Sequence, residues 1–351
     1  MAERIIESFQ VKRIEILDEK GNVDESLMPS LSDADIQRIY ELLILSRTFD
    51  QRALQLQREG RLGTYAPILG QEACQAGSAF ALEKSDWIFP SYRESGVYIT
   101  VGYPLHMLFQ YWEGDERGLK TPDTLNILPI SIPVGTQVLH AVGAAMAAKY
   151  RKDKAVAVTY FGDGGTSTGD FHEGLNMAGV FKLPVIFICQ NNQWAISMPR
   201  EKQTASKTIA QKAFSYGFEG LQVDGNDIFA VYKATEYALH KARQGDGPTL
   251  IECITYRIFD HTTADDASRY RPKQEVDAWK ARDPIQRLRL YMEKKGLLTA
   301  QYQKEIEEKA KSAIDEAVKT VESLEPPHPK EMFSYIYEKP TPRQTKELKD
   351  F

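Results

Sequence analysis

A glycine-rich turn between two apolar segments constrains the fold of this chain more than any other feature. Residues 154–161 form a mostly apolar segment that leads into Gly162-Asp163-Gly164-Gly165, and a second apolar segment, 185–189, leads into Gln190-Asn191-Asn192. Apolar runs without alternation are typical of parallel strands that are buried on both faces. We therefore predict one βαβ unit, with both polar tips at the carboxyl ends of its strands, where open α/β sheets bind ligands.

The segment that joins the two strands predicts a loop followed by a helix. Glycine in the turn can adopt positive φ and lets a ligand approach the backbone. Thr166, Ser167 and Thr168 add hydroxyls and amide donors. A helix over residues 170–181 would place its N-terminus beside the loop, and helix N-termini favour anions. The pattern therefore favours an anionic ligand at this turn.

The two strand ends pair a carboxylate with a carboxamide, which suits a metal-bound diphosphate. Mg²⁺ takes oxygen ligands at roughly 2.0–2.1 Å and shares them between a few protein groups, phosphates and water. Asp163 and Asn192 are therefore the predicted side-chain ligands. A dinucleotide fingerprint would need Gly at Ser167, a Walker loop Lys at Asp170, and the zinc motif H-E-x-x-H a second His at Asn176. The alternative is a glycine-rich turn and an unrelated Asn pair.

With these residues in view, the chain resembles the alpha subunits of the thiamine diphosphate-dependent decarboxylase component of 2-oxo acid dehydrogenase complexes. Gly162-Asp163-Gly164 followed by Asn191-Asn192 resembles the thiamine diphosphate motif, and residues 160–176 resemble the longer alpha-subunit sequence. Further matching segments are 63–67, 70–73, 90–94, 193–197, 223–227 and 256–266. Together they cover roughly residues 30–300 in the order found in that family.

Strands that alternate with helices after the first unit extend it into a doubly wound parallel sheet flanked by helices. The resemblance implies the same α/β class, a thiamine diphosphate-binding fold of the pyrophosphate-binding type. We expect this domain at residues 31–300, after an N-terminal extension at 1–30 and before a C-terminal helix and arm at 301–351. Other expected elements are helices from Ser32 to the low 60s, at 71–82, 227–244 and 299–324, a strand at 249–256, and loops at 113–130 and 257–271. The small residues of 141–150 favour either a helix or a close subunit contact.

The resemblance also implies roles for individual residues. It adds the backbone carbonyl of Trp194 as a third metal ligand. Beside Asp163 and Asn192, the cofactor-binding residues that it implies are Tyr92, Arg93, Ile132, Val134, Gly162, Gly164, Gly165, Thr166, Gln190, Ala195, Ile196 and His261. Val134 resembles the bulky residue that forces the V-shaped cofactor conformation. Gln190 replaces an Arg of some relatives, so its phosphate contact would be neutral and weaker.

His261 is the predicted catalytic residue, since the matching His of the family contacts the cofactor or the reacting acyl group. An imidazole can donate to a phosphate or transfer a proton near neutral pH. Without the resemblance, His261 would be read as a solvated loop residue and Arg93 as a surface side chain. Asp265, Arg269 and Arg271 are expected to order the loop through ion pairs. Thr262 stands where mitochondrial relatives carry a regulatory Ser, so the resemblance does not extend to kinase control at this position.

The chain has one sheet's worth of strand–helix units, whereas a thiamine diphosphate enzyme needs a second domain that supplies an activating Glu. The resemblance implies that a beta subunit provides it, in a heterotetramer of two alpha and two beta subunits. The implied reaction is oxidative decarboxylation of a 2-oxo acid with acyl transfer to the lipoamide of a dihydrolipoyl acyltransferase. Residues 63–73 favour pyruvate, while residues 261–271 also resemble branched-chain 2-oxo acid and acetoin dehydrogenases. A non-catalytic diphosphate-binding regulatory subunit is the alternative of another class.

Composition and charge narrow the remaining classes. The 351 residues suffice for one large or two ordinary domains. A net charge of -5 argues against a nucleic-acid or anionic-membrane surface. No run of residues reaches the roughly 20 apolar positions that cross a bilayer, and the N-terminus lacks an apolar signal-peptide core. Three unpatterned cysteines, Cys74, Cys189 and Cys253, indicate buried thiols in a reducing compartment. We therefore expect a cytoplasmic protein.

Overall fold

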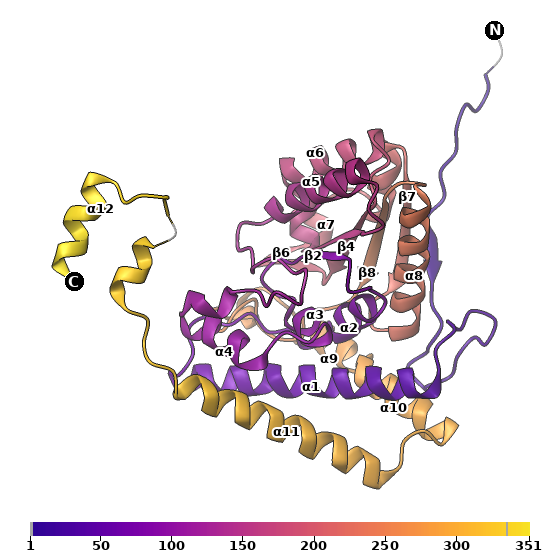
Figure 1. Ribbon diagram of the computed structural model, residues 1–351. Coiled ribbons are helices and arrows are strands. Elements are labelled where there is room, and N and C mark those ends of the chain that lie inside the picture. Colours follow the sequence, from indigo (N-terminus) through magenta and orange to yellow (C-terminus); the bar gives the residue numbers. More distant parts are fainter. Residues whose placement is uncertain (1–2, 335) are drawn as a thin grey trace.

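A six-stranded parallel sheet organises the computed structural model, which describes residues 3–334 and 336–351 (Figure 1). The strand order is β1-β7-β8-β4-β3-β2. The strands are β1 (Lys12–Ile14), β2 (Trp87–Phe89), β3 (Ala157–Gly162), β4 (Val185–Asn191), β7 (Glu219–Asp224) and β8 (Thr249–Ile254). A two-stranded hairpin, β5 (Trp194–Ala195) and β6 (Met198–Pro199), follows β4. The predicted α/β class with a parallel sheet is confirmed.

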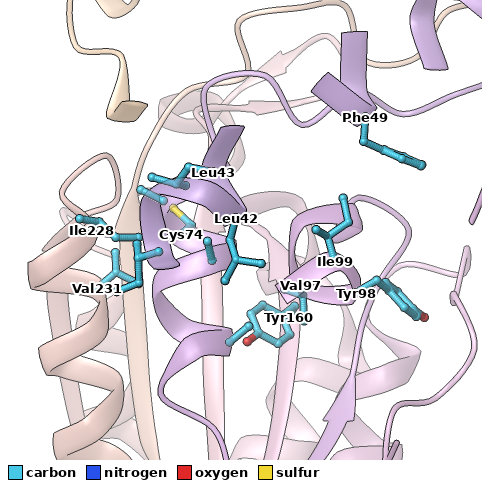
Figure 2. Packing of buried hydrophobic residues seen from close by; sticks show 14 of the residues in the cluster. Leu42, Leu43, Phe49, Cys74, Val97, Tyr98, Ile99, Tyr160, Ile228 and Val231 are labelled. Atoms are coloured by element: carbon cyan, nitrogen blue, oxygen red, sulfur yellow. The ribbon is translucent and has the colours of Figure 1, made fainter. Parts of the chain in front are cut away.

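Helices cover both faces of the sheet, because successive residues of the central strands point into two separate cores. On β3, Val158 and Tyr160 contribute to one core, whereas Ala157 and Phe161 contribute to the other. The first core lies under α1 (Asp33–Arg58), α2 (Glu72–Phe80), α3 (Ser95–Thr100) and α8 (Ile228–Gln244). Figure 2 shows Tyr160 in this core together with side chains of these four helices. The second core lies under α5 (Thr136–Arg151) and α6 (Gly169–Val180).

The described part of the chain contains further α-helices outside this central unit. They are α4 (Leu105–Glu113), α7 (Arg200–Gln203), α9 (Lys273–Lys280), α10 (Pro284–Lys295), α11 (Ala300–Glu322) and α12 (Pro342–Glu347). Helix α11 packs along α1, as Figure 1 shows, and the Tyr40 hydroxyl donates to Gln303 Oε1 at 2.8 Å. No helix within residues 3–334 or 336–351 is long and apolar enough to cross a membrane.

The N-terminal segment, which the sequence predicts only as an extended leader, contributes the edge strand β1 to the sheet. The buried Asp227 carboxylate holds this segment, because its Oδ2 accepts hydrogen bonds from the backbone N–H groups of Ile16 and Leu17 at 2.5 and 2.7 Å. The same carboxylate caps α8 through Phe229 and Ala230. One buried side chain thus joins the segment after β1 to the start of α8.

Candidate cofactor site

A cavity of about 780 Å³ opens at the carboxyl ends of β3 and β4. Of the predicted cofactor and metal residues, the structure places on its wall Tyr92, Arg93, Ile132, Val134, Gly162, Asp163, Gly164, Gly165, Gln190, Asn192, Trp194, Ala195, Ile196 and His261. Thr166 lies behind the wall, where its hydroxyl donates to the Asp163 carbonyl at 2.8 Å and stabilises the turn. The structure therefore brings together segments that lie far apart in the sequence.

The β5–β6 hairpin lies directly against the glycine turn that follows β3. A Cβ at Gly164 would lie 2.9 Å from Cβ of Ala195, closer than real Cβ contacts permit. The turn continues into α6, whose cap Thr168 accepts a hydrogen bond from the Phe171 N–H at 3.3 Å. Gly164 is therefore required by a close approach of two chain segments at the cavity wall.

Asp163 is the one predicted metal ligand with a charge, and one of its carboxylate oxygens lacks a hydrogen-bond partner among the described residues. The residue is 1% exposed, and its Oδ2 atom has no hydrogen-bond partner in the described part of the chain. Burial raises the pKa of Asp163 to about 6, and the Arg257 guanidinium offsets only part of this rise. A buried carboxylate oxygen without a partner is costly. A divalent cation in the cavity would satisfy this atom and favour the ionised form.

Asn192 presents a carboxamide to the same cavity, in an orientation fixed by two hydrogen bonds. Its Nδ2 donates to Oε1 of Gln71 at 3.0 Å, and its Oδ1 accepts from the Trp194 N–H at 3.3 Å. The Trp194 carbonyl, the predicted third ligand, accepts from Nη1 of Arg257 at 3.2 Å. No group of three or more His, Cys, Asp or Glu side chains suited to a metal occurs among the described residues. The donor set here is different, since it combines one carboxylate with amide and backbone oxygens, which suit a hard cation such as Mg²⁺.

The hairpin that carries Trp194 contains two residues in the left-handed region, Gln193 at φ 72° and Ile196 at φ 54°. Positive φ in a β-branched residue is a true outlier and costs of order 1–3 kcal/mol. Arg257 holds this conformation, because its guanidinium donates to the carbonyl oxygens of Trp194 and Ile196 at 3.2 and 2.8 Å. Such strain is typical of ligand-binding turns.

In the cluster of Arg93, Arg257 and His261, Arg93 and His261 line the cavity, and the buried Arg257 lies beside His261 without lining the cavity itself. Nη2 of Arg93 donates to the His261 carbonyl at 2.8 Å and lies 3.1 Å from its Nδ1, and Nη1 of Arg257 lies 3.3 Å from the same nitrogen. Nη1 of Arg93 also donates to the Pro67 carbonyl at 2.8 Å, so Arg93 joins two loops. Burial, followed by the two guanidinium groups, lowers the pKa of His261 to about 3. His261 is therefore a neutral imidazole beside two fixed positive charges.

Hydrogen bonds, rather than the expected ion pairs, order the loop around His261. Asp265 accepts from the His261 N–H at 2.9 Å and from the Tyr270 hydroxyl. Arg271 donates to the carbonyl groups of residues 257, 258 and 259. In residues 257–271, all of which the structure describes, neither Asp265, Arg269 nor Arg271 forms an ion pair, so that expectation was wrong. Backbone carbonyls satisfy Arg271 because the loop folds back over it.

Gln190 lies on the wall, but its amide is already engaged. Its Nε2 donates to Oε1 of Glu94 at 2.6 Å, and its Oε1 accepts from Nε2 of Gln75 at 2.9 Å. Burial raises the pKa of Glu94 to about 7. Gln71, Glu94 and Arg257 were not singled out from the sequence. Each lies inside a matching segment, and only tertiary contacts show that Gln71 and Glu94 line the cavity and that Arg257 supports its wall through the carbonyls of Trp194 and Ile196.

The neutral state of His261 gives a testable pH dependence. An unfolded chain binds a proton at an ordinary histidine pKa of about 6.5, whereas folded His261 has a pKa of about 3. His261 therefore lowers the stability of the fold as pH falls from 6.5 towards 3. In ligand-free protein, we expect the NMR signal of the His261 imidazole, assigned by loss in His261→Asn, to stay constant between pH 5 and 8. A titration midpoint near 6.5 would contradict the cluster geometry.

The site can be compared with known proteins. The model of the family described as "Dehydrogenase E1 component" matches residues 40–330. The chain is 44% identical over 332 residues to the "Pyruvate dehydrogenase E1 component subunit alpha" of Bacillus cereus, covering 94% of this chain and 90% of the relative. It is 46% identical over 327 residues to the protein of the same name from Staphylococcus aureus (strain Mu50 / ATCC 700699), covering 93% and 88%.

A relative whose name gives a different substrate is equally similar. The "3-methyl-2-oxobutanoate dehydrogenase subunit alpha" of Mycobacterium tuberculosis (strain CDC 1551 / Oshkosh) is 46% identical over 312 residues. The match covers 89% of this chain and 85% of that relative. Identity alone therefore does not separate the two substrates.

Proposed function

Because the chain belongs to the dehydrogenase E1 component family, we propose that it is the alpha subunit of a pyruvate dehydrogenase that uses thiamine diphosphate and Mg²⁺. The observation that carries this proposal is the unpaired, buried Oδ2 of Asp163 at a glycine turn, on the wall of a cavity at the carboxyl ends of two parallel strands. Ligands of open α/β sheets bind at such positions.

The residues present fit a metal-bound diphosphate. Asp163, the Oδ1 of Asn192 and the Trp194 carbonyl would hold the cation. The backbone at Gly164 and Gly165 would supply donors to the diphosphate, beside the N-terminus of α6. When bound, thiamine diphosphate supplies an electron sink for the loss of CO₂ from a 2-oxo acid.

The cluster of Arg93, Arg257 and His261 suits an anionic substrate. Arg93 and Arg257 place two guanidinium groups around His261, and burial strengthens their effect on a carboxylate. His261, neutral and with Nδ1 facing both guanidinium groups, would carry its proton on Nε2. From there it can donate a hydrogen bond to the diphosphate or to the acyl group. We propose His261 as the catalytic residue of this chain on that basis.

The exposed apolar residues at the rim of the cavity favour an interface with a partner chain. Ile132, Val134 and Ile196 line the opening and are 52%, 50% and 56% exposed, and neighbouring Met198 is 46% exposed. Exposed apolar groups gathered around a ligand cavity mark an interaction site. A beta subunit would cover them, in a heterotetramer of two alpha and two beta subunits, and the lipoyl domain of a dihydrolipoyl acyltransferase would receive the acyl group. Three free, buried cysteines support a cytoplasmic location.

Kinetics with a substrate panel test the proposed reaction. The chain, assembled with its beta-type partner, is expected to turn over pyruvate with a kcat/KM about 10- to 100-fold above that for 3-methyl-2-oxobutanoate, since extra methylene groups in a fitted pocket change specificity by such factors. Acetoin serves as the third substrate. A preference for the branched 2-oxo acid would favour the activity in the name of the mycobacterial relative. Absence of turnover with all three, despite cofactor binding, would identify a non-catalytic diphosphate-binding subunit.

A further inference from the structure

Gln71 lies at the junction of the segments that build the metal end of the cavity. It is the N-cap of α2, and Gly70 before it adopts φ +94°, where a Cβ would lie 2.7 Å from the Tyr256 carbonyl oxygen. The Gly70 carbonyl accepts from the Thr255 hydroxyl at 2.8 Å, and the Thr255 N–H donates to the Asn191 carbonyl at 3.0 Å. These contacts fix the backbone of Gln71 beside the end of β4.

The hydrogen bonds of this region define which atom each amide presents. The Trp194 N–H requires an acceptor, so it faces Oδ1 of Asn192. The Nδ2 of Asn192 then requires an acceptor, and Oε1 of Gln71 lies 3.0 Å away. The bond to Trp194 is long at 3.3 Å, so it constrains the Asn192 amide weakly by itself. Gln71 supplies the second constraint, which keeps Oδ1 rather than Nδ2 available for a cation.

The other end of the Gln71 amide is unsatisfied. Gln71 is completely buried and lines the cavity, yet its Nε2 has no hydrogen-bond partner among the described residues. Unpaired buried donors are rare and call for an explanation. On the same wall, Oδ2 of Asp163 is an unpaired acceptor. The Nε2 donor of Gln71 suits an anionic oxygen, and the Oδ2 acceptor of Asp163 suits a cation. The two unpaired atoms therefore match the negative and the positive part of a metal-bound diphosphate.

We propose that Gln71 is a positioning residue of this site, which locks the Asn192 carboxamide through Oε1 and donates from Nε2 to an anionic oxygen of the bound cofactor. This inference rests on the proposed thiamine diphosphate function and deepens it. Groups that hydrogen-bond to a metal ligand, and so orient it, typically raise metal affinity by 10- to 100-fold. Gln71 would act in this way although its own oxygen is not a metal ligand.

Two substitutions separate the two ends of the side chain. Gln71→Met has a similar shape but removes both the acceptor and the donor, whereas Gln71→Glu keeps an acceptor for Asn192 and replaces the donor by oxygen. Binding of thiamine diphosphate to the assembled alpha–beta pair is measured by calorimetry over a series of Mg²⁺ concentrations. Gln71→Met is expected to raise the Mg²⁺ concentration at half-saturation by about 10- to 100-fold. Gln71→Glu is expected to retain the wild-type Mg²⁺ midpoint and to weaken cofactor binding at saturating Mg²⁺ by about tenfold, since hydrogen bonds to charged groups contribute this much or more.

A matched control is Gln110→Met, which removes another buried glutamine; Gln110 lies on α4 and bonds to Asp115. The control should bind as the wild type does. Equal Mg²⁺ midpoints in Gln71→Met and the wild type, with both proteins folded by thermal melting, would overturn the inference. So would the same raised midpoint in Gln71→Met and Gln71→Glu, because a retained acceptor would then have no effect. Wild-type protein that fails to bind thiamine diphosphate would instead refute the proposed function, a separate outcome.

Discussion

Asp163→Ala is expected to abolish Mg²⁺-dependent binding of thiamine diphosphate, with a loss in affinity of more than about 100-fold, beyond the range typical of outer groups. The carboxylate is the only charged side chain of the predicted donor set, and its Oδ2 has no other partner in the described structure. The remaining donors, Asn192 and the Trp194 carbonyl, are neutral and cannot replace its charge. Calorimetry on the assembled complex, with and without Mg²⁺, measures the effect.

Stability separates this loss of binding from a loss of structure. The folded pKa of Asp163 is about 6, above the ordinary value of about 3.9. The stability associated with the protonated form is therefore present at low pH and is lost as pH rises through 6. Without metal at pH 7, Asp163→Asn should consequently melt at the same temperature as the wild type or higher. An exposed control, Asp123→Asn, should change neither property. Unchanged cofactor affinity in the Asp163 variants would show that the metal site lies elsewhere.

The central strand–helix–strand unit could be predicted from sequence because local signals agree there. The expected strand, helix and strand at 154–161, 170–181 and 185–189 correspond to β3, α6 and β4. Apolar runs, a glycine turn and a capping hydroxyl all act over a few residues. Strand β1 could not be predicted, since it has three residues and exists through its pairing with β7, more than 200 residues away in sequence. Only tertiary contacts define such an edge strand.

The site residues also fall into two groups, those that the sequence predicts and those that only the structure reveals. Asp163 and Asn192 stand at the ends of recognisable strands, so their position followed from the fold. Gln71 and Arg257 act through hydrogen bonds to Asn192, Trp194 and Ile196, and no local pattern distinguishes a side chain that makes such bonds. The loop around His261 was expected to use ion pairs because it is rich in charges. Backbone carbonyl groups satisfy Arg271 instead, and the His261 N–H and the Tyr270 hydroxyl satisfy Asp265.

The purified chain alone is expected to have no 2-oxo acid dehydrogenase activity, which should appear only when a beta-type subunit is added. The described chain has one parallel sheet with one cofactor-type cavity at its carboxyl edge, and apolar residues around the opening remain exposed. A cavity that opens to solvent leaves the reacting groups hydrated, which weakens the effect of Arg93 and Arg257 on a bound carboxylate. A partner that covers Ile132, Val134 and Ile196 would exclude that water and add its own groups.

The most direct test of this account is to measure CO₂ release from pyruvate by the chain, with thiamine diphosphate, Mg²⁺ and an artificial electron acceptor, while a beta-type subunit is titrated in. The account predicts a rate at the assay background without the partner and a linear rise that reaches a plateau at one beta chain per alpha chain. A variant with a charge on the rim, Met198→Glu, which is outside the predicted cofactor-binding set, should shift the titration to higher partner concentrations. Turnover by the chain free of any partner, at a rate that the added subunit leaves unchanged, would contradict the account.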